Sequence, residues 1–280
     1  MDDLRARLGP DRRVFAAFHP LLPDEPLVFV HVALRTFIPS SMTHVLEATD
    51  SNNHDVSVAT FYSISSTQPG LSGVDLGKVL LQSAVQLLRQ EFDSLDTFVT
   101  LSPIPRFRKW FQDKISFHNQ EGSTFKDDAL IPPEDMKEWQ EVLGCRSEEE
   151  VSVRLAELLQ DPTEMMEQHV GNDGMLETVL TRLVARYLVL EKHRRKPLDL
   201  VARFHLHNGA ELYRINYMAD TSRKGWHNSL GLMVNYRYNL AELEENQVKY
   251  DKEDEIQVRE EVRNLLPKTK AGEAGVTSIN

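Results

Sequence analysis

The stretch FYSISSTQPGLSGVDLGKVLLQSAVQLLRQEF, residues 61–92, decides the fold class of this chain. It starts inside an apolar, β-branched segment, residues 56–66, which is typical of a buried strand. A glycine-containing loop then leads into residues 72–92, where apolar residues recur at helical spacing. The segment DTFVTLSP, residues 96–103, has the pattern of another strand. A strand, a long helix and a strand in this order favour a parallel crossover. The apolar stripe predicted for the helix consists of Val79, Leu80, Ala84, Leu87 and Leu88.

The segments on either side extend this core into an α/β protein with a mixed sheet. Residues 25–34 have the pattern of a buried strand, and residues 198–219 and 229–240 return to β pattern. Between them, residues 106–197 predict a helical insertion. Within this insertion, Ser147 and Glu150 form a capping box, and a stripe of Leu176, Val179, Leu180, Leu183, Val184, Tyr187 and Leu188 is expected to be buried.

Composition limits the kinds of partner. The chain has 280 residues and a formal net charge of −11, which argues against a general nucleic-acid-binding protein. Cys145 is the only cysteine, so no disulfide framework or cysteine-based zinc site is expected. The first residues lack the apolar core of a secretory signal, and no apolar run is long enough to span a bilayer. We therefore expect an intracellular, soluble protein that binds neither nucleic acid nor membrane.

The segment RFHLHNGAELYR, residues 203–214, carries two histidines just before an Asn-Gly pair. Asn208-Gly209 predicts a type I′ turn, which would place Arg203, His205 and His207 on one face of a β-hairpin, with Arg214 opposite Arg203. Three interpretations follow. The histidines are packed and hydrogen-bonded, or they ligate a metal with help from distant residues, or they perform acid–base chemistry. The arginines disfavour a cation and favour an anionic ligand.

Two further positions suggest anion binding or catalysis. Ser72 and Asp75 match a capping box at the start of the long helix, whose free N–H groups suit a phosphate, although an ordinary capped loop explains the same residues. The charge of Asp75 would oppose a phosphate. Ser102 ends the strand after this helix, where ligands of parallel sheets bind, although it is equally a turn serine before Pro103. The Gly-x-Ser-x-Gly pattern of a nucleophile elbow is missing.

Four motifs, in series, resemble one family. The motifs are FYSISSTQPGLSGVDLGK, LSPIPRF, FHLHNGAELYRINYMADTS and GLMVNYRY, and in this order they resemble malonyl-CoA decarboxylase over roughly residues 14–240. The resemblance implies a GNAT-type acyltransferase fold. It also implies a carboxy-lyase that converts malonyl-CoA to acetyl-CoA and CO2 in malonyl-CoA and fatty-acid metabolism.

The same resemblance implies roles for individual residues. Ser102 and His205 fall on the catalytic serine and histidine of the family, the histidine as a protonated donor to carbon. Tyr238 is an expected active-site neighbour, and no role is transferred to His207. No metal or other cofactor is implied, because the CoA thioester itself is the substrate. The positions that fall on the CoA-binding turn are Ser72, Gly73, Val74, Asp75, Leu76, Gly77 and Lys78.

The resemblance also sets expectations for organisation. Residues 1–240 are expected to form the catalytic domain, and residues 241–280 a charged tail of helix or coil with a frayed end. The N-terminal helical domain of many relatives is expected to be absent, because the catalytic part begins almost at Met1. A homo-oligomer is expected by resemblance, in the cytoplasm, the mitochondrial matrix or a peroxisome.

Two other functions fit the same pattern. The general GNAT pyrophosphate motif is not met in register after Gln68, since Leu71 stands where that motif has glycine. An acyl-CoA-dependent N- or O-acyltransferase of GNAT fold is one alternative. A CoA-binding module without turnover is the other, and the presence of both Ser102 and His205 argues against it.

Overall fold

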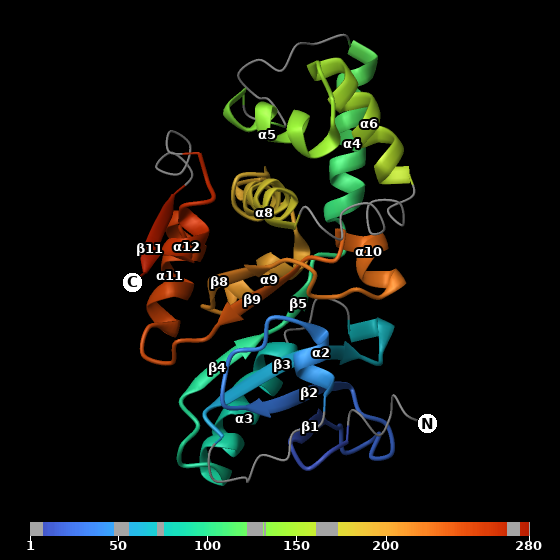
Figure 1. Ribbon diagram of the computed structural model, residues 1–280. Coiled ribbons are helices and arrows are strands. Elements are labelled where there is room, and N and C mark those ends of the chain that lie inside the picture. The colour runs from blue at the N-terminus through green and yellow to red at the C-terminus, as the bar shows by residue number, and fades with distance from the viewer. Residues whose placement is uncertain are drawn as a thin grey trace. The chain divides into compact units, whose positions relative to one another are not determined.

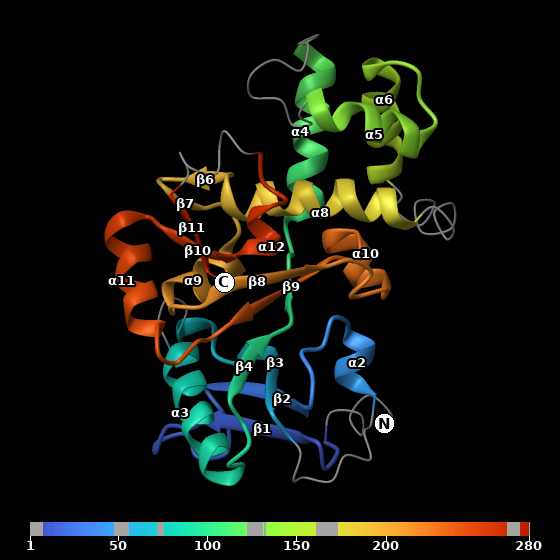
Figure 2. The ribbon, with the colours of Figure 1, turned by 60° about the vertical axis from the view of Figure 1, so that its left-hand side comes forward.

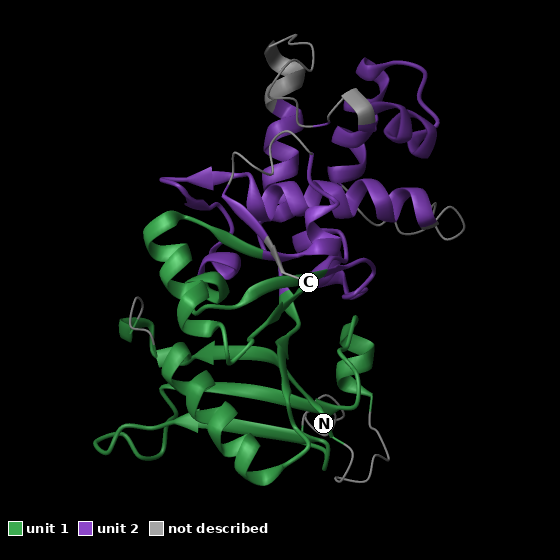
Figure 3. Ribbon diagram, turned by 90° about the vertical axis from the view of Figure 1, so that its left-hand side faces the viewer, with its two compact units in different colours: residues 1–102, 204–214, 234–257 green, residues 103–203, 215–233, 258–280 purple. Residues whose placement is uncertain are grey.

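The computed structural model describes residues 8–47, 56–71, 76–121, 131, 133–160, 173–267 and 275–279. The chain forms two compact units, coloured separately in Figure 3. The first unit contains residues 1–102, 204–214 and 234–257, and the second contains residues 103–203, 215–233 and 258–280.

The first unit is built on a mixed β-sheet, as expected for an α/β protein. Its strands lie in the order β1-β2-β3-β4-β9-β8-β10. Strand β1 was not predicted from the sequence and pairs antiparallel with β2, which in turn pairs antiparallel with β3. The strand bounds are β1 Arg12–Ala17, β2 Val28–Arg35, β3 Val58–Ser66, β4 Thr97–Thr100, β8 Glu211–Asn216, β9 Met233–Arg237 and β10 Ile256–Arg259.

The predicted parallel crossover is confirmed. Strands β3 and β4 are parallel, with Val58 opposite Thr97 and Phe61 opposite Thr100. Helix α3, Leu76–Glu91, connects them and packs along β1 and β2 (Figure 1). The stripe prediction for this helix was partly wrong, because Val79 and Leu87 are exposed. The buried face consists of Leu80, Leu81, Ala84 and Leu88.

Strands β3 and β4 separate where β4 ends. The N–H of Leu101 still donates to the carbonyl of Phe61, at 3.0 Å, but β3 then continues to Ser66 without β4 beside it. From Ser102, in β5 (Ser102–Pro103), the chain pairs with β9 instead. The predicted position of Ser102, just past the carboxyl end of a parallel strand, is therefore confirmed.

The hairpin predicted for residues 198–219 was wrong. Residues Leu200–His207 form helix α9, and only Glu211–Asn216 form a strand. The helix begins after Asp199, whose Oδ1 accepts from the N–H of Ala202 at 2.8 Å. It ends in a Schellman motif, in which the N–H of Ala210 donates to the carbonyl of His205 and Gly209 has φ +81°.

The error has a physical explanation. An Asn-Gly pair serves a type I′ turn and a helix terminus equally well, because both need a residue with positive φ. The burial of Ala202, His205, Leu206 and Gly209 repeats at i, i+3, i+4 and i+7, which is helical spacing. The β-strand prediction placed Leu206 and His205 on opposite faces, whereas the helix buries both.

Two arginines fix helix α2, Met42–Leu46, in the first unit. The guanidinium of Arg35 donates to the carbonyls of His44 and Val45, at 3.0 and 2.8 Å. Asp11 accepts from Arg35 at 2.6 Å and pairs with the buried Arg12 at 2.7 Å, so the carboxylate offsets two buried cations. This cluster ties β1, β2 and α2 together.

The second unit contains the helices of the predicted insertion. Helices α4, α5 and α6 pack together, and α5 also contacts α8 (Figure 2). The capping prediction is confirmed, since the N–H of Glu150 donates to Ser147 Oγ at 3.2 Å, and every residue of the predicted stripe on α8 is buried. No helix of the described segments is long and apolar enough to cross a membrane. The helix bounds are α4 Phe107–Glu121, α5 Pro133–Leu143, α6 Glu148–Gln160, α8 Asp173–Val189, α10 Arg223–Ser229 and α12 Glu260–Arg263.

The charged tail is more structured than the sequence predicted. Residues Leu243–Glu253 form α11, as a helix was expected, but Ile256–Arg259 then join the sheet as β10. Helix α12 and strand β11, Val276–Ile279, follow where a frayed end was expected. Buried apolar residues among the charges, such as Ile256 and Val258, explain why this segment folds.

Gly209 provides a test of how α9 ends. A Cβ at this position would lie 2.1 Å from the backbone oxygen of Leu243, and its φ is positive. Left-handed backbone costs an L-residue about 1–2 kcal/mol, and overpacking about 1–3 kcal/mol more. We expect Gly209→Ala to lower the free energy of unfolding by at least about 2 kcal/mol in urea titration.

Gly70→Ala is the matched control, since a Cβ there meets no atom within 4 Å. Equal stabilities of the two variants would contradict the close approach between Gly209 and Leu243.

Candidate active site

Ser102 lies at the point where the chain leaves β4. Its side chain is 5% exposed, and its Oγ is 2.9 Å from Thr100 Oγ1 and 3.0 Å from His205 Nε2. Thr100 Oγ1 also accepts the N–H of Tyr236 at 3.2 Å. The serine is thus fixed by a strand end on one side and by an imidazole from α9 on the other.

His205 is held on all sides within the first unit. Its ring is 3% exposed and stacks on Tyr236, with centroids 4.5 Å apart and planes at 25°. Its Nδ1 is 2.8 Å from the hydroxyl of Tyr238. Both ring nitrogens therefore have hydrogen-bond partners, and the expected neighbour Tyr238 lies in direct contact with the histidine.

The hydrogen bonds form one directed chain. Ser102 Oγ donates to Thr100 Oγ1, which leaves the serine oxygen to accept from His205 Nε2–H. Nδ1 of the neutral ring then accepts from the hydroxyl of Tyr238. The chain runs Tyr238 to His205 to Ser102 to Thr100, and the hydroxyl protons of Tyr238 and Ser102 and the Nε2 proton of His205 all point along it.

Burial keeps the side chains of this hydrogen-bonded chain neutral. Desolvation lowers the pKa of His205 to about 3, from 6.5 for a free histidine. The same cause raises the pKa of Tyr238 above its usual range. The protonated His205 expected from the sequence is therefore wrong for the free protein, since at neutral pH the imidazole carries no charge.

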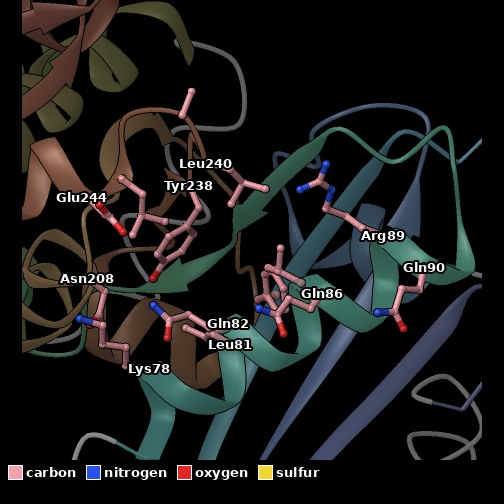
Figure 4. A pocket seen from close by; sticks show the side chains of 14 residues that line it. Lys78, Leu81, Gln82, Gln86, Arg89, Gln90, Asn208, Tyr238, Leu240 and Glu244 are labelled. Carbon is pink, nitrogen blue, oxygen red and sulfur yellow. The ribbon is translucent and has the colours of Figure 1, made fainter.

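A cavity of about 750 Å³ opens beside the hydrogen-bonded chain of Tyr238, His205 and Ser102. One wall is the solvent-facing side of α3, which contributes Lys78, Gln82, Gln86 and Arg89, and the opposite wall includes Tyr238 (Figure 4). A second hollow of about 610 Å³ shares Arg89 and Tyr238 with it. The cavity therefore reaches the hydrogen-bonded chain at Tyr238. The remaining lining residues are Phe61, Leu81, Val85, Gln90, Asn208, Leu240, Ala241, Leu243 and Glu244.

The predicted CoA-binding turn is only partly within the described residues. Ser72, Gly73, Val74 and Asp75 lie outside them, whereas Leu76, Gly77 and Lys78 form the first turn of α3. Lys78 lines the cavity and donates to Gln247 Oε1 at 3.1 Å. Gly77 lies against α9, since a Cβ there would be 3.1 Å from Phe204 Cζ. The start of α3 is thus adjacent to the helix that carries His205.

His207 and the two arginines do not share a face with His205. His207 is half-exposed and pairs with Asp251, with Nδ1 2.8 Å from Oδ1. On a helix, residues two apart point in different directions, so the predicted row of Arg203, His205 and His207 was wrong. Arg203 donates to the carbonyl of Pro197, and Arg214 donates to the carbonyls of Ile38 and Pro39 at 3.0 and 3.1 Å. These arginines fix backbone segments.

The two histidines also do not form a metal clamp. Both nitrogens of His205 have partners in Ser102 and Tyr238. Within the described segments, no group of three or more His, Cys, Asp or Glu side chains could hold a metal ion.

Sequence reasoning missed two supporting residues. Thr100 holds the serine, and Tyr236 stacks on the histidine. The alternation in the segment NYRY, residues 235–238, places Tyr236 and Tyr238 on the same side of β9, and that pattern was a usable signal.

Comparison with known proteins identifies the family. The family model for the malonyl-CoA decarboxylase C-terminal domain matches residues 1–276. The chain is 39% identical to rat mitochondrial malonyl-CoA decarboxylase over 94% of its own length, and 38% identical to the mouse protein of that name. It covers 53% of each of these relatives, about half their length.

Solved structures agree with this result. Malonyl-CoA decarboxylases from Rhodopseudomonas palustris and Agrobacterium vitis match with TM-scores of 0.73 and 0.74, each at 35% identity. The matches cover 94% and 95% of this chain and 58% and 60% of those chains. The fold is that of an α/β protein with a mixed sheet and a buried serine–histidine pair. The chain belongs to the malonyl-CoA decarboxylase C-terminal domain family.

Buried, neutral His205 makes a prediction about pH and stability. Below pH 6.5 the unfolded chain protonates this histidine, whereas the folded chain does so only near pH 3. The contribution of His205 to stability is therefore fully present above pH 6.5 and is lost as pH falls, by about 1.4 kcal/mol per pH unit.

The measurement compares urea unfolding of the wild type and of His205→Asn between about pH 7.5 and pH 4.5. The wild type should lose stability more steeply than the variant as pH falls. Parallel curves would contradict a neutral, buried imidazole.

Proposed function

We propose that this chain catalyses the decarboxylation of malonyl-CoA to acetyl-CoA and CO2. The observation that carries the proposal is the 3.0 Å contact between Ser102 Oγ and His205 Nε2. These residues are 103 positions apart in sequence and come from two of the four motifs that resemble the family. Membership of the malonyl-CoA decarboxylase C-terminal domain family supports the same activity.

The reaction needs few chemical groups. The bond between C2 and the carboxylate breaks, and its electron pair moves into an enolate whose negative charge rests on the thioester oxygen. CO2 leaves, and a proton then joins C2 to give the acetyl group. The thioester itself accepts the electrons, so the protein must stabilise the enolate oxygen and supply one proton.

The hydrogen-bonded chain is suited to supplying that proton. An enolate carbon is a strong base, so a neutral donor is sufficient. Ser102 gives its hydroxyl proton to C2, His205 Nε2–H replaces it, and the hydroxyl of Tyr238 gives its proton to Nδ1. Tyr238 lines the cavity and takes one proton back from water, so that none of these buried groups keeps a lasting charge.

The cavity along α3 is proposed to hold the CoA moiety. Lys78 and Arg89 are the cations of its lining, as an anionic nucleotide requires. The turn of residues 72–78 is proposed, from the family resemblance, to hold the phosphates. Of this turn, Leu76, Gly77 and Lys78 are at the N-terminus of α3, where anions are favoured.

The test is incubation with malonyl-CoA alone. We expect acetyl-CoA and CO2 to form in equal amounts without any acceptor. An acyltransferase would stay inactive until an amine or alcohol acceptor is added. A CoA-binding module would bind malonyl-CoA and leave it intact. Either result would overturn the proposal.

Substitution of the two histidines separates catalysis from packing. We expect His205→Asn to lower turnover by about 10²–10⁴-fold, the usual contribution of a positioned acid or base. Asparagine is polar and of similar size but cannot relay the proton. His207→Asn, which removes only the half-exposed contact with Asp251, is the matched control and should leave turnover within about threefold.

Melting temperature is measured beside turnover for both variants. Equal losses of turnover at the two positions would indicate that the histidines act together and would contradict the assignment of His205 alone.

Chelation tests the expectation of a metal-free reaction. The proposed mechanism uses the thioester as electron acceptor, so turnover should be unchanged after prolonged dialysis against a strong chelator. Elemental analysis of the active protein should find no stoichiometric zinc or iron. Turnover that is lost on chelation and restored by one added metal would refute this mechanism.

A further inference from the structure

Asn208 is buried and polar, and the described residues offer its side-chain oxygen no hydrogen bond. The residue is 4% exposed, and its Oδ1 has no partner among them. A buried polar atom without a partner destabilises the folded state, so such atoms are rare in proteins unless water or a ligand satisfies them. The side chain of Asn208 therefore has a role other than stabilising the fold.

The backbone does not explain the asparagine. Asparagine is favoured where φ is positive, but here the residue with positive φ is Gly209, at +81°. The hydrogen bonds at the end of α9 use main-chain groups of Asn208, Gly209 and Ala210. An apolar side chain at position 208 would satisfy the same helix terminus.

The position of Asn208 places it at the reacting end of the cavity. It lines the cavity together with Tyr238, whose hydroxyl contacts His205 Nδ1. It follows His205 by three residues at the end of α9, and residues three apart on a helix share a face. Figure 4 shows Asn208, Lys78, Gln82 and Tyr238 gathered at one end of the lining, and Arg89 and Gln90 at the other.

We propose that the side-chain amide of Asn208 donates a hydrogen bond to the thioester carbonyl oxygen of the acyl-CoA, and so stabilises the enolate. The inference rests on the proposed decarboxylase function and assigns a substrate-contacting role to a residue for which the sequence indicated only a turn. The amide nitrogen carries two N–H donors, and a half-turn of the side chain exchanges it with Oδ1, so either end of the amide can carry the donors.

A neutral amide suits this oxygen better than a cation does. The thioester oxygen is neutral when the substrate binds and becomes negative only as the bond between C2 and the carboxylate breaks. A fixed N–H donor gains strength as that charge develops, and no charge has to be buried beforehand. The electron pair of the broken bond ends on an oxygen that is already hydrogen-bonded, and CO2 departs without its own proton.

The test uses two variants of Asn208. Asn208→Leu is nearly isosteric and removes only the amide, and Asn208→Ala removes the whole group. We expect both to lower turnover of malonyl-CoA by about 10²-fold, as loss of one oxyanion donor does. We expect melting temperature to be unchanged or higher, because a buried unpaired polar group has been removed, and affinity for free CoA to stay within about threefold.

A second readout isolates the enolate. In D2O, the enzyme should exchange the methyl protons of acetyl-CoA for deuterium through the same enolate, with no CO2 involved. Both variants should slow this exchange about as much as they slow decarboxylation. If decarboxylation slows but exchange does not, Asn208 contacts the departing carboxylate and the proposal is wrong.

Two control variants define a structural effect. Leu87→Ala changes an exposed residue of α3 that does not line the cavity, and it should leave both rates unchanged. Asn246→Ala removes a buried amide that donates to the carbonyl of Gly209 at 3.3 Å, and it should lower melting temperature without a selective loss of turnover.

The remaining outcomes are also decisive. Weaker CoA binding with normal turnover would place Asn208 on the pantetheine arm and overturn the proposal, as would normal rates in both variants. If the wild type itself does not turn over malonyl-CoA, the proposed function fails first, and this outcome is distinguishable from failure at Asn208 alone.

Discussion

A buried imidazole with both ring nitrogens hydrogen-bonded is the constraint on which the site depends. His205 Nε2 meets Ser102 and Nδ1 meets Tyr238, at 3.0 and 2.8 Å. The ring is 3% exposed, so without these partners its buried nitrogens would lack hydrogen bonds and would lower the stability of the fold. With them, the ring is held in one orientation and remains neutral, since desolvation lowers its pKa to about 3. Three segments that are far apart in sequence must therefore fold correctly before the site exists.

The fold satisfies this constraint at the ends of two regular elements, β4 and α9. Strand β4 ends at Thr100 while β3 continues, and Ser102, in β5, then pairs with β9 and lies within 3.0 Å of His205 Nε2. Helix α9 ends at His207, and the positive φ of Gly209 lets the chain turn into β8. The reactive side chains lie at the ends of regular elements, where neither a sheet ladder nor a helix continues to fix them. The polar contacts among Ser102, His205 and Tyr238 take over that task.

Much of the first unit was predictable from the sequence because its signals are local. The β3–α3–β4 crossover follows from apolar periodicity, and Ser102 was correctly placed at a strand end. The hairpin prediction failed because Asn208-Gly209 fits two kinds of chain reversal, and only tertiary burial of Ala202 and Leu206 selects the helix. The charge of His205 was also mispredicted. A pKa depends on desolvation by residues distant in sequence, and that information is absent from the motif itself.

Helix α11 changes how the C-terminal segment should be regarded. Asn246 donates to the carbonyl of Gly209, Gln247 accepts from Lys78, and Leu243 approaches Gly209 closely. Leu243 and Glu244 also line the cavity. This C-terminal segment, which the sequence suggests is a charged tail, therefore forms part of the cavity wall. Expression of a shortened chain that stops near residue 240, or a protease cut before α11, would remove one wall and expose the end of α9.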